Sequence, residues 1–294
     1  MPASGAYVAI DWGTTNRRAY LMGADGAVLD SVRTDRGVLA VAPGAFPLEV
    51  AAIREQMGQL PILAAGMIGS TRGWIDVPYV GAPAGADALA TGAVAAPAND
   101  MWIIPGVAFT DGDRCDVMRG EEIQVIGAVQ AGLAPPDAQF CQPGTHNKWI
   151  VCADGKILSF ATALTGELFA LLRDHGILAG MLNGPIADGP AFRKGVNRGA
   201  RSCDLSVALF EVRAAVLLGE MKPEDAAAFA SGVLIGSDVG ARDDLAAAPV
   251  HLLGSGPLAE LYESAIAICG GQTVRLDGNA AFAAGIHHIR ELRS

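Results

Sequence analysis

Residues Tyr7 to Tyr20 decide the fold of this chain, and their sequence is YVAIDWGTTNRRAY. Two apolar segments flank a polar turn at Gly13 to Asn16, which predicts two antiparallel strands joined by that turn. Gly13 can adopt positive φ and bring its backbone close to a ligand, and successive N–H groups in such a turn form a concave anion site. Asp11 lies near the end of a strand that we expect to be buried, where a carboxylate needs a partner.

We interpret this turn as a phosphate cradle. Asp11 would hold the Mg²⁺ that accompanies a nucleotide, because Mg²⁺ is bound by one or two carboxylates together with phosphates and waters. The residues expected to bind the phosphates are Gly13, Thr14, Thr15 and Asn16. The alternative is an ordinary hairpin whose Asp and Thr side chains only satisfy turn amides.

Composition limits the class of protein. A chain of 294 residues with 51% hydrophobic and 18% charged residues is large enough for two hydrophobic cores, so we expect two domains. The net charge of −10 and the absence of a Lys/Arg-rich stripe argue against nucleic acid or an anionic membrane as partner. An apolar signal core is absent at the N-terminus, which predicts a cytoplasmic protein. The five cysteines form no C-x-x-C pair, so neither a disulfide framework nor a zinc site is expected.

Each half of the chain shows the same succession of predicted elements. The first half, residues 1–136, has a three-stranded meander, a helix from Pro47 and alternating strands and helices up to Pro135-Pro136. The second half, 137–294, begins with another meander and ends with an amphipathic helix from Asn279. The other helices predicted are 84–96, 121–131, 167–174, 204–218, 223–235 and 257–269. The apolar stripes at 204–218 and 223–235 suit either a core or a homodimer interface.

Two further turns are candidate ligand sites. The second meander contains Pro143-Gly144-Thr145-His146-Asn147-Lys148 between its first two strands, the position that the first cradle occupies in its own half. The third turn, Gly254-Ser255-Gly256, joins a strand to a helix. Its G-x-G-x-x-A pattern imitates a dinucleotide fingerprint, but too few residues follow it for the further β-α units of a Rossmann half. A plain helix-capping turn with Pro257 in the first turn is the other interpretation.

Together these features resemble the sugar kinase, hexokinase, actin and heat-shock chaperone superfamily. The resemblance implies an α/β fold with two ribonuclease-H-like (actin/hexokinase-type) domains and a nucleotide cleft between them. It also implies that the two cradles grip the ATP phosphates and that residues 254–256 form the adenosine loop. The second cradle departs from the usual acidic form, since His146 and Lys148 stand where many members have an Asp.

Longer matches resemble 2-keto-3-deoxygalactonate kinases. They are Asp11-Trp12-Gly13-Thr14-Thr15-Asn16, Gly66-Met67-Ile68-Gly69-Ser70 with Trp74, Val117-Met118-Arg119-Gly120-Glu121-Glu122, Pro143-Gly144-Thr145-His146 with Lys148-Trp149, and Thr165-Gly166-Glu167-Leu168. The resemblance implies transfer of the γ-phosphoryl group of ATP to the 6-hydroxyl of 2-keto-3-deoxy-D-galactonate in galactose or galactonate catabolism, with Mg²⁺ as the metal.

The reaction needs a carboxylate that accepts the proton of the attacking hydroxyl. We favour Asp116, which we expect in a loop that leads into a helix, a layout similar to the Asn-Asp segment of hexokinases. Glu121 is the rival, although a carboxylate there would also complement the helix dipole. Arg119 is a candidate donor to the carboxylate of a sugar acid, because its planar fork matches that group.

The Gly-rich loop after the strand at 61–65 is the expected substrate site. Its candidate residues are Gly66, Met67, Ile68, Gly69, Ser70, Arg72 and Trp74. The competing functional class is an ATPase of the same fold that works by conformational change, but such proteins usually carry insertions that this chain lacks. Hydrolysis of polyphosphate is a third class, and it would favour a basic tunnel that the acidic composition does not supply.

Overall fold

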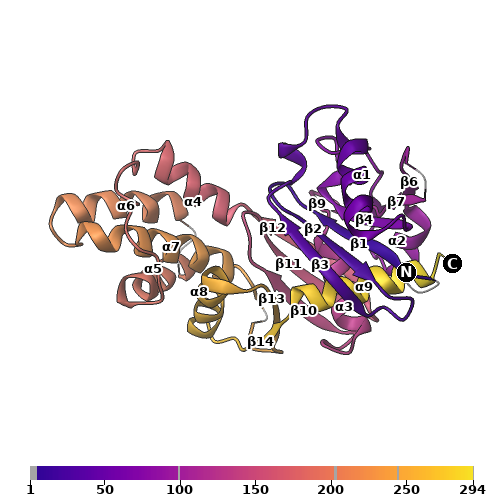
Figure 1. Cartoon of the computed structure of the whole chain (residues 1–294). Coiled ribbons are helices and arrows are strands. Elements are labelled where there is room, and N and C mark those ends of the chain that lie inside the picture. Colours follow the sequence, from indigo (N-terminus) through magenta and orange to yellow (C-terminus); the bar gives the residue numbers. More distant parts are fainter. Residues whose placement is uncertain (1–4, 99, 202–203, 244, 294) are drawn as a thin grey trace. The chain divides into compact units, whose positions relative to one another are not determined.

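The computed structural model describes residues 5–98, 100–201, 204–243 and 245–293. The chain forms two compact units (Figure 1). Unit 1 comprises Met1–Asp137, Val151–Phe160 and Gly278–Ser294, and unit 2 comprises Ala138–Ile150 and Ala161–Asp277. The first break lies one residue from the predicted boundary. Residues 151–160 and the final helix, which the sequence analysis counts with the second half, belong to unit 1.

Unit 1 is built on a six-stranded sheet. In spatial order its strands are β3 (Val28–Thr34), β2 (Arg17–Met22), β1 (Tyr7–Trp12), β4 (Ile62–Gly66), β7 (Met101–Ile103) and β6 (Val94–Ala95). β1 pairs antiparallel with β2, as the opening stretch predicts, and parallel with β4 on its other side. This register places Asp11 beside Ala65 and Trp12 beside Gly66. The carboxyl ends of β1 and β4 therefore meet at one edge of the sheet.

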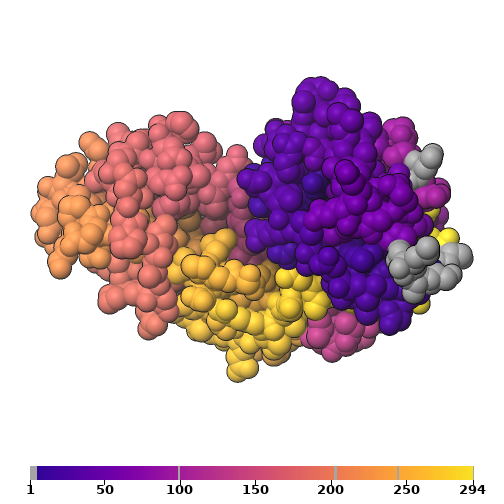
Figure 2. All heavy atoms as spheres, viewed as in Figure 1, coloured from indigo at the N-terminus to yellow at the C-terminus, as the bar shows by residue number. Residues whose placement is uncertain are grey.

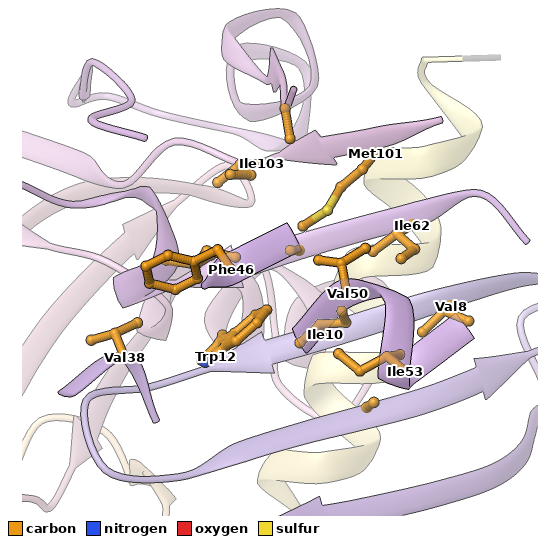
Figure 3. Packing of buried hydrophobic residues seen from close by; sticks show 14 of the residues in the cluster. Val8, Ile10, Trp12, Val38, Phe46, Val50, Ile53, Ile62, Met101 and Ile103 are labelled. Carbon is orange, nitrogen blue, oxygen red and sulfur yellow. The ribbon is translucent and has the colours of Figure 1, made fainter. Parts of the chain in front are cut away.

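The core of unit 1 lies between this sheet and α1 (Phe46–Met57). Pro47 occupies the first turn of α1, where its missing N–H costs nothing. Val50 and Ile53 extend from the helix toward Ile10 of β1 (Figure 3). The rings of Trp12 and Phe46 pack with their centroids 5.6 Å apart. The end of β1 is thus anchored in a dry core immediately before the polar turn begins.

The last helix, α9 (Gly278–Glu291), packs on α3 (Glu121–Gln130) within unit 1. A Cβ at Gly127 would lie 1.8 Å from the carbonyl oxygen of Ala281, so the two helix backbones are in direct contact there. α9 also contacts β1, and the ring of Phe282 stacks on Tyr20 with the centroids 5.5 Å apart. In Figure 2 the bright yellow atoms of the C-terminal helix adjoin the indigo atoms of the first strands.

Unit 1 contains a second, smaller sheet that the sequence analysis did not predict. Its strands are β5 (Val80–Gly81), β8 (Val107–Asp111) and β9 (Arg114–Met118). The helix predicted at 84–96 is shorter than expected, because α2 (Ala86–Gly92) ends where β6 pairs with β7. Two short 3-10 helices, η1 (Val38–Ala40) and η2 (Met67–Gly69), border the carboxyl ends of the strands.

The sheet of the second half has the order β12 (Lys156–Ala163), β11 (Asn147–Ala153), β10 (Ala138–Gln142), β13 (Val250–Leu253) and β14 (Thr273–Leu276). In this sheet the three strands of the meander, in the order β12, β11 and β10, are again followed by two further strands, β13 and β14. β10, β13 and β14 run parallel. The strand order of the first sheet is therefore repeated, as the succession of elements predicts. The remaining elements of unit 2 are α4 (Thr165–Asp174), α5 (Pro190–Ala200), α6 (Leu205–Leu217), η3 (Pro223–Asp225), α7 (Ala226–Gly240) and α8 (Gly256–Ile268).

α5 and α7 pack backbone against backbone. Four glycines with i, i+4 spacing make this possible, namely Gly195 and Gly199 of α5 and Gly232 and Gly236 of α7. A Cβ at Gly199 would lie only 2.1 Å from the carbonyl oxygen of Val233. α6 packs outside this pair and leaves Phe210 and Leu217 exposed. A homodimer through this face stays a prediction.

Among the described residues, no helix combines the length and the apolar character that crossing a bilayer requires.

Candidate active site

The turn after β1 is closed by a hydrogen bond from the N–H of Gly13 to the carbonyl of Asn16, 2.9 Å long. The carbonyls of Gly13, Thr14 and Thr15 accept hydrogen bonds from residues 37–39, at and just before η1. In the described part of the chain, the N–H groups of Thr14 and Thr15 donate to no backbone carbonyl. The carbonyl groups of the turn are therefore occupied, while the N–H groups of Thr14 and Thr15 remain available to an anion.

Two carboxylates converge beside this turn. Gly66 ends β4 at φ 95°, and a Cβ there would lie 2.8 Å from the carbonyl oxygen of Trp12. Gly120, which precedes α3, lies against Gly66 in turn. Burial and the nearby charge of Glu121 together raise the pKa of Asp11 from 3.8 to about 6, with Arg18 opposing them. The ends of β1 and β4 thus bring Asp11 and the first residue of α3 into electrostatic contact.

This pair of carboxylates fits a hydrated Mg²⁺. The described residues contain no group of three His, Cys, Asp or Glu side chains that would form a complete protein cage for a metal. Mg²⁺ does not need such a cage, because it keeps several waters and is usually held by one or two carboxylates and the phosphates of its substrate. A divalent cation would also relieve the repulsion that raises the pKa of Asp11.

The next residue of α3, Glu122, is fully buried and was not predicted to matter. Both of its carboxylate oxygens accept a hydrogen bond from the N–H of Gly120, at 2.9 and 2.7 Å. Burial, followed by the charge of Glu121, raises the pKa of Glu122 from 4.5 to about 8. Glu122 therefore fixes the start of α3 as a largely neutral acid.

We expect Glu122→Gln to stabilise the protein at pH 8 and to have little effect at pH 5. The folded protein binds a proton at Glu122 more tightly than the unfolded chain, so Glu122 makes the wild type lose stability as the pH rises from about 4.5 to 8. Glutamine keeps one acceptor for Gly120 and has no proton to lose. Thermal unfolding of both proteins across this range should give curves that diverge by up to a few kcal/mol as the pH rises. Parallel curves would show that Glu122 is ionised in the folded protein.

In unit 2, the second turn lies against the first turn of α4. The N–H of Glu167 donates to the carbonyl of Thr145 over 3.0 Å, and a Cβ at Gly166 would lie 2.8 Å from the carbonyl oxygen of Gly144. His146 is exposed and its Nε2 pairs with the Glu167 carboxylate. Lys148 is the second residue of β11 and its side chain is buried. The start of α4 therefore packs against the backbone of the turn, and the buried Lys148 follows the turn in β11.

A cavity of about 250 Å³ opens beside this turn, entirely within unit 2. Its lining includes Gly144, Thr165 and Gly166, and also Pro257, Leu258, Leu261 and Tyr262 of α8. The rest of the lining is mostly apolar and comes from α4, α7 and the segment between α4 and α5: Phe169, Ile186, Ser231, Leu234 and Ile235. Such a cavity suits the flat, mostly apolar ring system of a ligand whose phosphates extend toward the turn.

The third turn borders the same region. Gly254 lies against the ring of Pro143, which a Cβ at Gly254 would meet at 3.4 Å. Ser255 precedes α8 in extended conformation without a side-chain capping bond, and Gly256 begins the helix at φ 74°. The turns that sequence analysis singled out at 144–148 and 254–256 therefore lie together in unit 2.

Comparison with known proteins decides the family. The sequence profile of 2-keto-3-deoxy-galactonokinase matches residues 11–289. The chain is 36% identical over 289 residues to the 2-dehydro-3-deoxygalactonokinase of Escherichia coli K12, covering 96% of this chain and 97% of that protein. This chain belongs to the 2-keto-3-deoxy-galactonokinase family.

Solved structures agree with this assignment. A 2-dehydro-3-deoxygalactonokinase candidate from Sinorhizobium meliloti superposes with a TM-score of 0.88 at 35% identity, covering 97% of this chain and 96% of that chain. The Acidaminococcus fermentans (R)-2-hydroxyglutaryl-CoA dehydratase component A shares only the fold, with a TM-score of 0.52, 13% identity and coverage of 99% and 100%. The predicted α/β fold of two actin-like halves is confirmed.

The family assignment does not identify the catalytic base, and the structure changes the argument for it. Asp116 lies on β9 and not in a loop as expected, because 107–118 forms a β-hairpin. Its carboxylate accepts from the N–H of Val117 at 2.7 Å and lies 3.9 Å from Arg114. The carboxylate whose charge acts on Asp11 is that of Glu121. Glu121 also accepts a backbone hydrogen bond, from the N–H of Arg119 at 3.1 Å. We propose Glu121 as the base because of its electrostatic effect on Asp11.

Arg119 packs against the loop that is proposed to bind the sugar acid. The Arg119 side chain is buried, lies 4.2 Å over the Tyr79 ring and donates from Nη2 to the carbonyl of Val77 at 2.7 Å. Its Nε and Nη1 are shielded from solvent and have no hydrogen-bond partner, and Nη1 lies beneath Gly69. A substrate carboxylate would reach these two donors only if the turn at Met67–Gly69 shifts.

Two other loop residues have structural side chains. Ile68 is fully buried in the core, and the Trp74 ring stacks on Phe46 with the centroids 6.0 Å apart. Ile68 can therefore reach a ligand only through its backbone, whereas Trp74 is half-buried. Ser70 is also committed, since its Oγ donates to the carbonyl of Met67 at 2.7 Å. Arg72 is exposed on this loop and is the accessible cation there.

Sequence analysis missed three residues of unit 2 around the cavity. Thr165 and Tyr262 line it, and both donate to the buried carboxylate of Asp238 on α7. The sequence feature that could have indicated Asp238 is that it is the single acidic residue in the mostly apolar stretch 226–240. The predicted helix ended at 235, so this residue fell outside it.

Proposed function

We propose that this member of the 2-keto-3-deoxy-galactonokinase family transfers the γ-phosphoryl group of ATP to the 6-hydroxyl of 2-keto-3-deoxy-D-galactonate. The observation that carries the chemistry is the pair of carboxylates, Asp11 and Glu121, beside a turn in which the N–H groups of Thr14 and Thr15 donate to no backbone carbonyl of the described residues. Phosphoryl transfer needs positioned phosphates, a metal and an acceptor for one proton, and little else. The choice of sugar acid comes from the names of the relatives.

In this mechanism Asp11 would hold Mg²⁺, and the metal would supply positive charge to the phosphoryl group during its transfer. The amides of Thr14 and Thr15 are the proposed donors to phosphate oxygens in unit 1, and those of Gly144 to His146 are the proposed donors in unit 2. Backbone donors fixed in a turn need no reorganisation during the reaction. Glu121 accepts the proton of the attacking hydroxyl. The neutral Glu122 beside it keeps the start of α3 in place.

The sugar carboxylate is an anion that must bind next to another anion. We place it on the Gly66 to Ser70 loop, with Arg72 as the accessible donor and Arg119 as a second donor once the loop shifts. Substrates without the carboxylate would leave these donors unpaired. Sites built for polar recognition reject such analogues strongly.

We expect 2-keto-3-deoxygalactonate to give the highest kcat/KM in a panel that also contains its gluconate epimer, galactonate, glucose and glycerol. ADP release is measured with a coupled assay, and Asp11→Asn purified in parallel serves as the control for contaminating kinases. Glucose and glycerol should be at least about 10³-fold poorer. If either were the best substrate, the assignment of a sugar acid would be wrong; a preference for the gluconate epimer would overturn only the stereochemistry.

A further inference from the structure

Unit 2 contains a buried carboxylate that accepts four hydrogen bonds. Asp238, on α7, is 7% exposed. Its Oδ2 accepts from Asn147 Nδ2 at 2.7 Å, from the Tyr262 hydroxyl at 2.8 Å and from Thr165 Oγ1 at 3.3 Å. Its Oδ1 accepts from Trp149 Nε1 at 2.9 Å. A buried carboxylate persists only when its oxygens are satisfied in this way.

The donors come from three elements that border the second turn or the cavity. Asn147 is the first residue of β11 and directly follows the turn. Thr165 begins α4, whose next two residues pack on Gly144 and Thr145. Tyr262 lines the cavity from α8. One carboxylate therefore connects the turn, the helix that supports it and the α8 side of the cavity.

The chemistry of this cluster requires a carboxylate. Asn147 and Trp149 can only donate through the nitrogens that face Asp238, so an amide at 238 would have to turn its own NH₂ toward at least one of these donors. Burial and the charge of Asp238 raise the pKa of Tyr262, so its hydroxyl stays protonated and available as a donor. Asparagine at this position would therefore disconnect at least one of the elements while conserving the size of the side chain.

We propose that Asp238 is a positioning residue for the nucleotide, which holds the second phosphate turn, the start of α4 and the Tyr262 wall in the arrangement that binds ATP. This inference rests on the proposed function, because it takes the turn and cavity as the ATP site. Asp238 itself does not line the cavity. A contribution to the core alone would change the stability of unit 2 and leave the affinity for ATP unaltered.

Calorimetric titration with ATP, without sugar acid, separates these roles in Asp238→Asn, Tyr262→Phe and a control, Val212→Ala. Val212 is fully buried in the cluster around α6 and is not one of the residues that line the cavity, so its truncation lowers the melting temperature without removing a contact of the turn. We expect Asp238→Asn to raise the Kd for ATP by about ten- to a hundred-fold and Tyr262→Phe by about three-fold or more. In turnover, Asp238→Asn should raise the KM for ATP and leave the KM for the sugar acid unchanged.

A folded Asp238→Asn that binds ATP within about two-fold of the wild type would overturn the inference. So would an equal rise of Kd in Val212→Ala. If Asp238→Asn does not fold, Tyr262→Phe decides by the same criterion. Wild-type protein that binds ATP but phosphorylates no sugar acid would refute the proposed reaction and leave the role of Asp238 standing.

Discussion

Asp11→Asn is expected to lower the turnover of Mg·ATP and sugar acid by at least about 10³-fold, because the variant loses the carboxylate that holds the metal. The same change should not destabilise the protein. Ionised Asp11 lies beside Glu121, and its raised pKa of about 6 means that the folded protein loses stability as the pH rises from about 4 to 6. The asparagine variant avoids that loss. At pH 7.5 without nucleotide it should melt at or above the temperature of the wild type.

Steady-state kinetics and thermal unfolding of the same preparations check both statements. Asp30→Asn is the matched control, because it makes the same change of charge on an exposed residue of β3 in the same sheet. It should keep wild-type turnover. A folded Asp11→Asn with near-normal turnover would show that Asp11 is only a turn residue. A lower melting temperature at pH 7.5 would show that Asp11 stabilises the fold as a carboxylate.

Glu121→Gln is expected to lower kcat by about 10²-fold to 10⁴-fold with little change in the affinity for ATP, because a general base acts on the hydroxyl and not on the nucleotide. The matched variant is Asp116→Asn. It replaces a carboxylate of the same unit that contacts Arg114 and the backbone of β9, so it should leave kcat within a few-fold of the wild type. Single-turnover kinetics with saturating ATP isolate the chemical step.

The opposite result would restore the interpretation made from sequence. If Asp116→Asn lost turnover while Glu121→Gln kept it, the hairpin β8–β9 would have to bring Asp116 to the sugar. Loss of turnover in both variants would indicate that both carboxylates take part in transferring the same proton. Neither outcome would affect the role of Asp11.

The fold was predictable where a single local rule governs a segment. Alternating apolar residues around the turn at Gly13 predict β1 and β2, and Pro47 marks the start of α1 to within one residue. The repeated order of elements predicts the second sheet. The hairpin β8–β9 was missed although its turn, Gly112-Asp113 between the paired residues Asp111 and Arg114, is a common hairpin signal. α5 was missed because two glycines inside a short polar helix look like helix breakers.

The sequence by itself determined the family, the positions of the two turns proposed to bind phosphate and the place of Asp11 near the end of β1, because each depends on short motifs of residues that are adjacent in the chain. Tertiary structure decided which residues become partners. It selected Glu121 over Asp116 as the neighbour of Asp11, and it buried Arg119 beneath the Gly69 turn. It also assembled four donors around Asp238 from β11, α4 and α8. These residue pairs are far apart in the chain, in the case of Asp11 and Glu121 by more than a hundred positions. Local sequence patterns carry no information about such pairs, because burial and pairing depend on how whole elements pack.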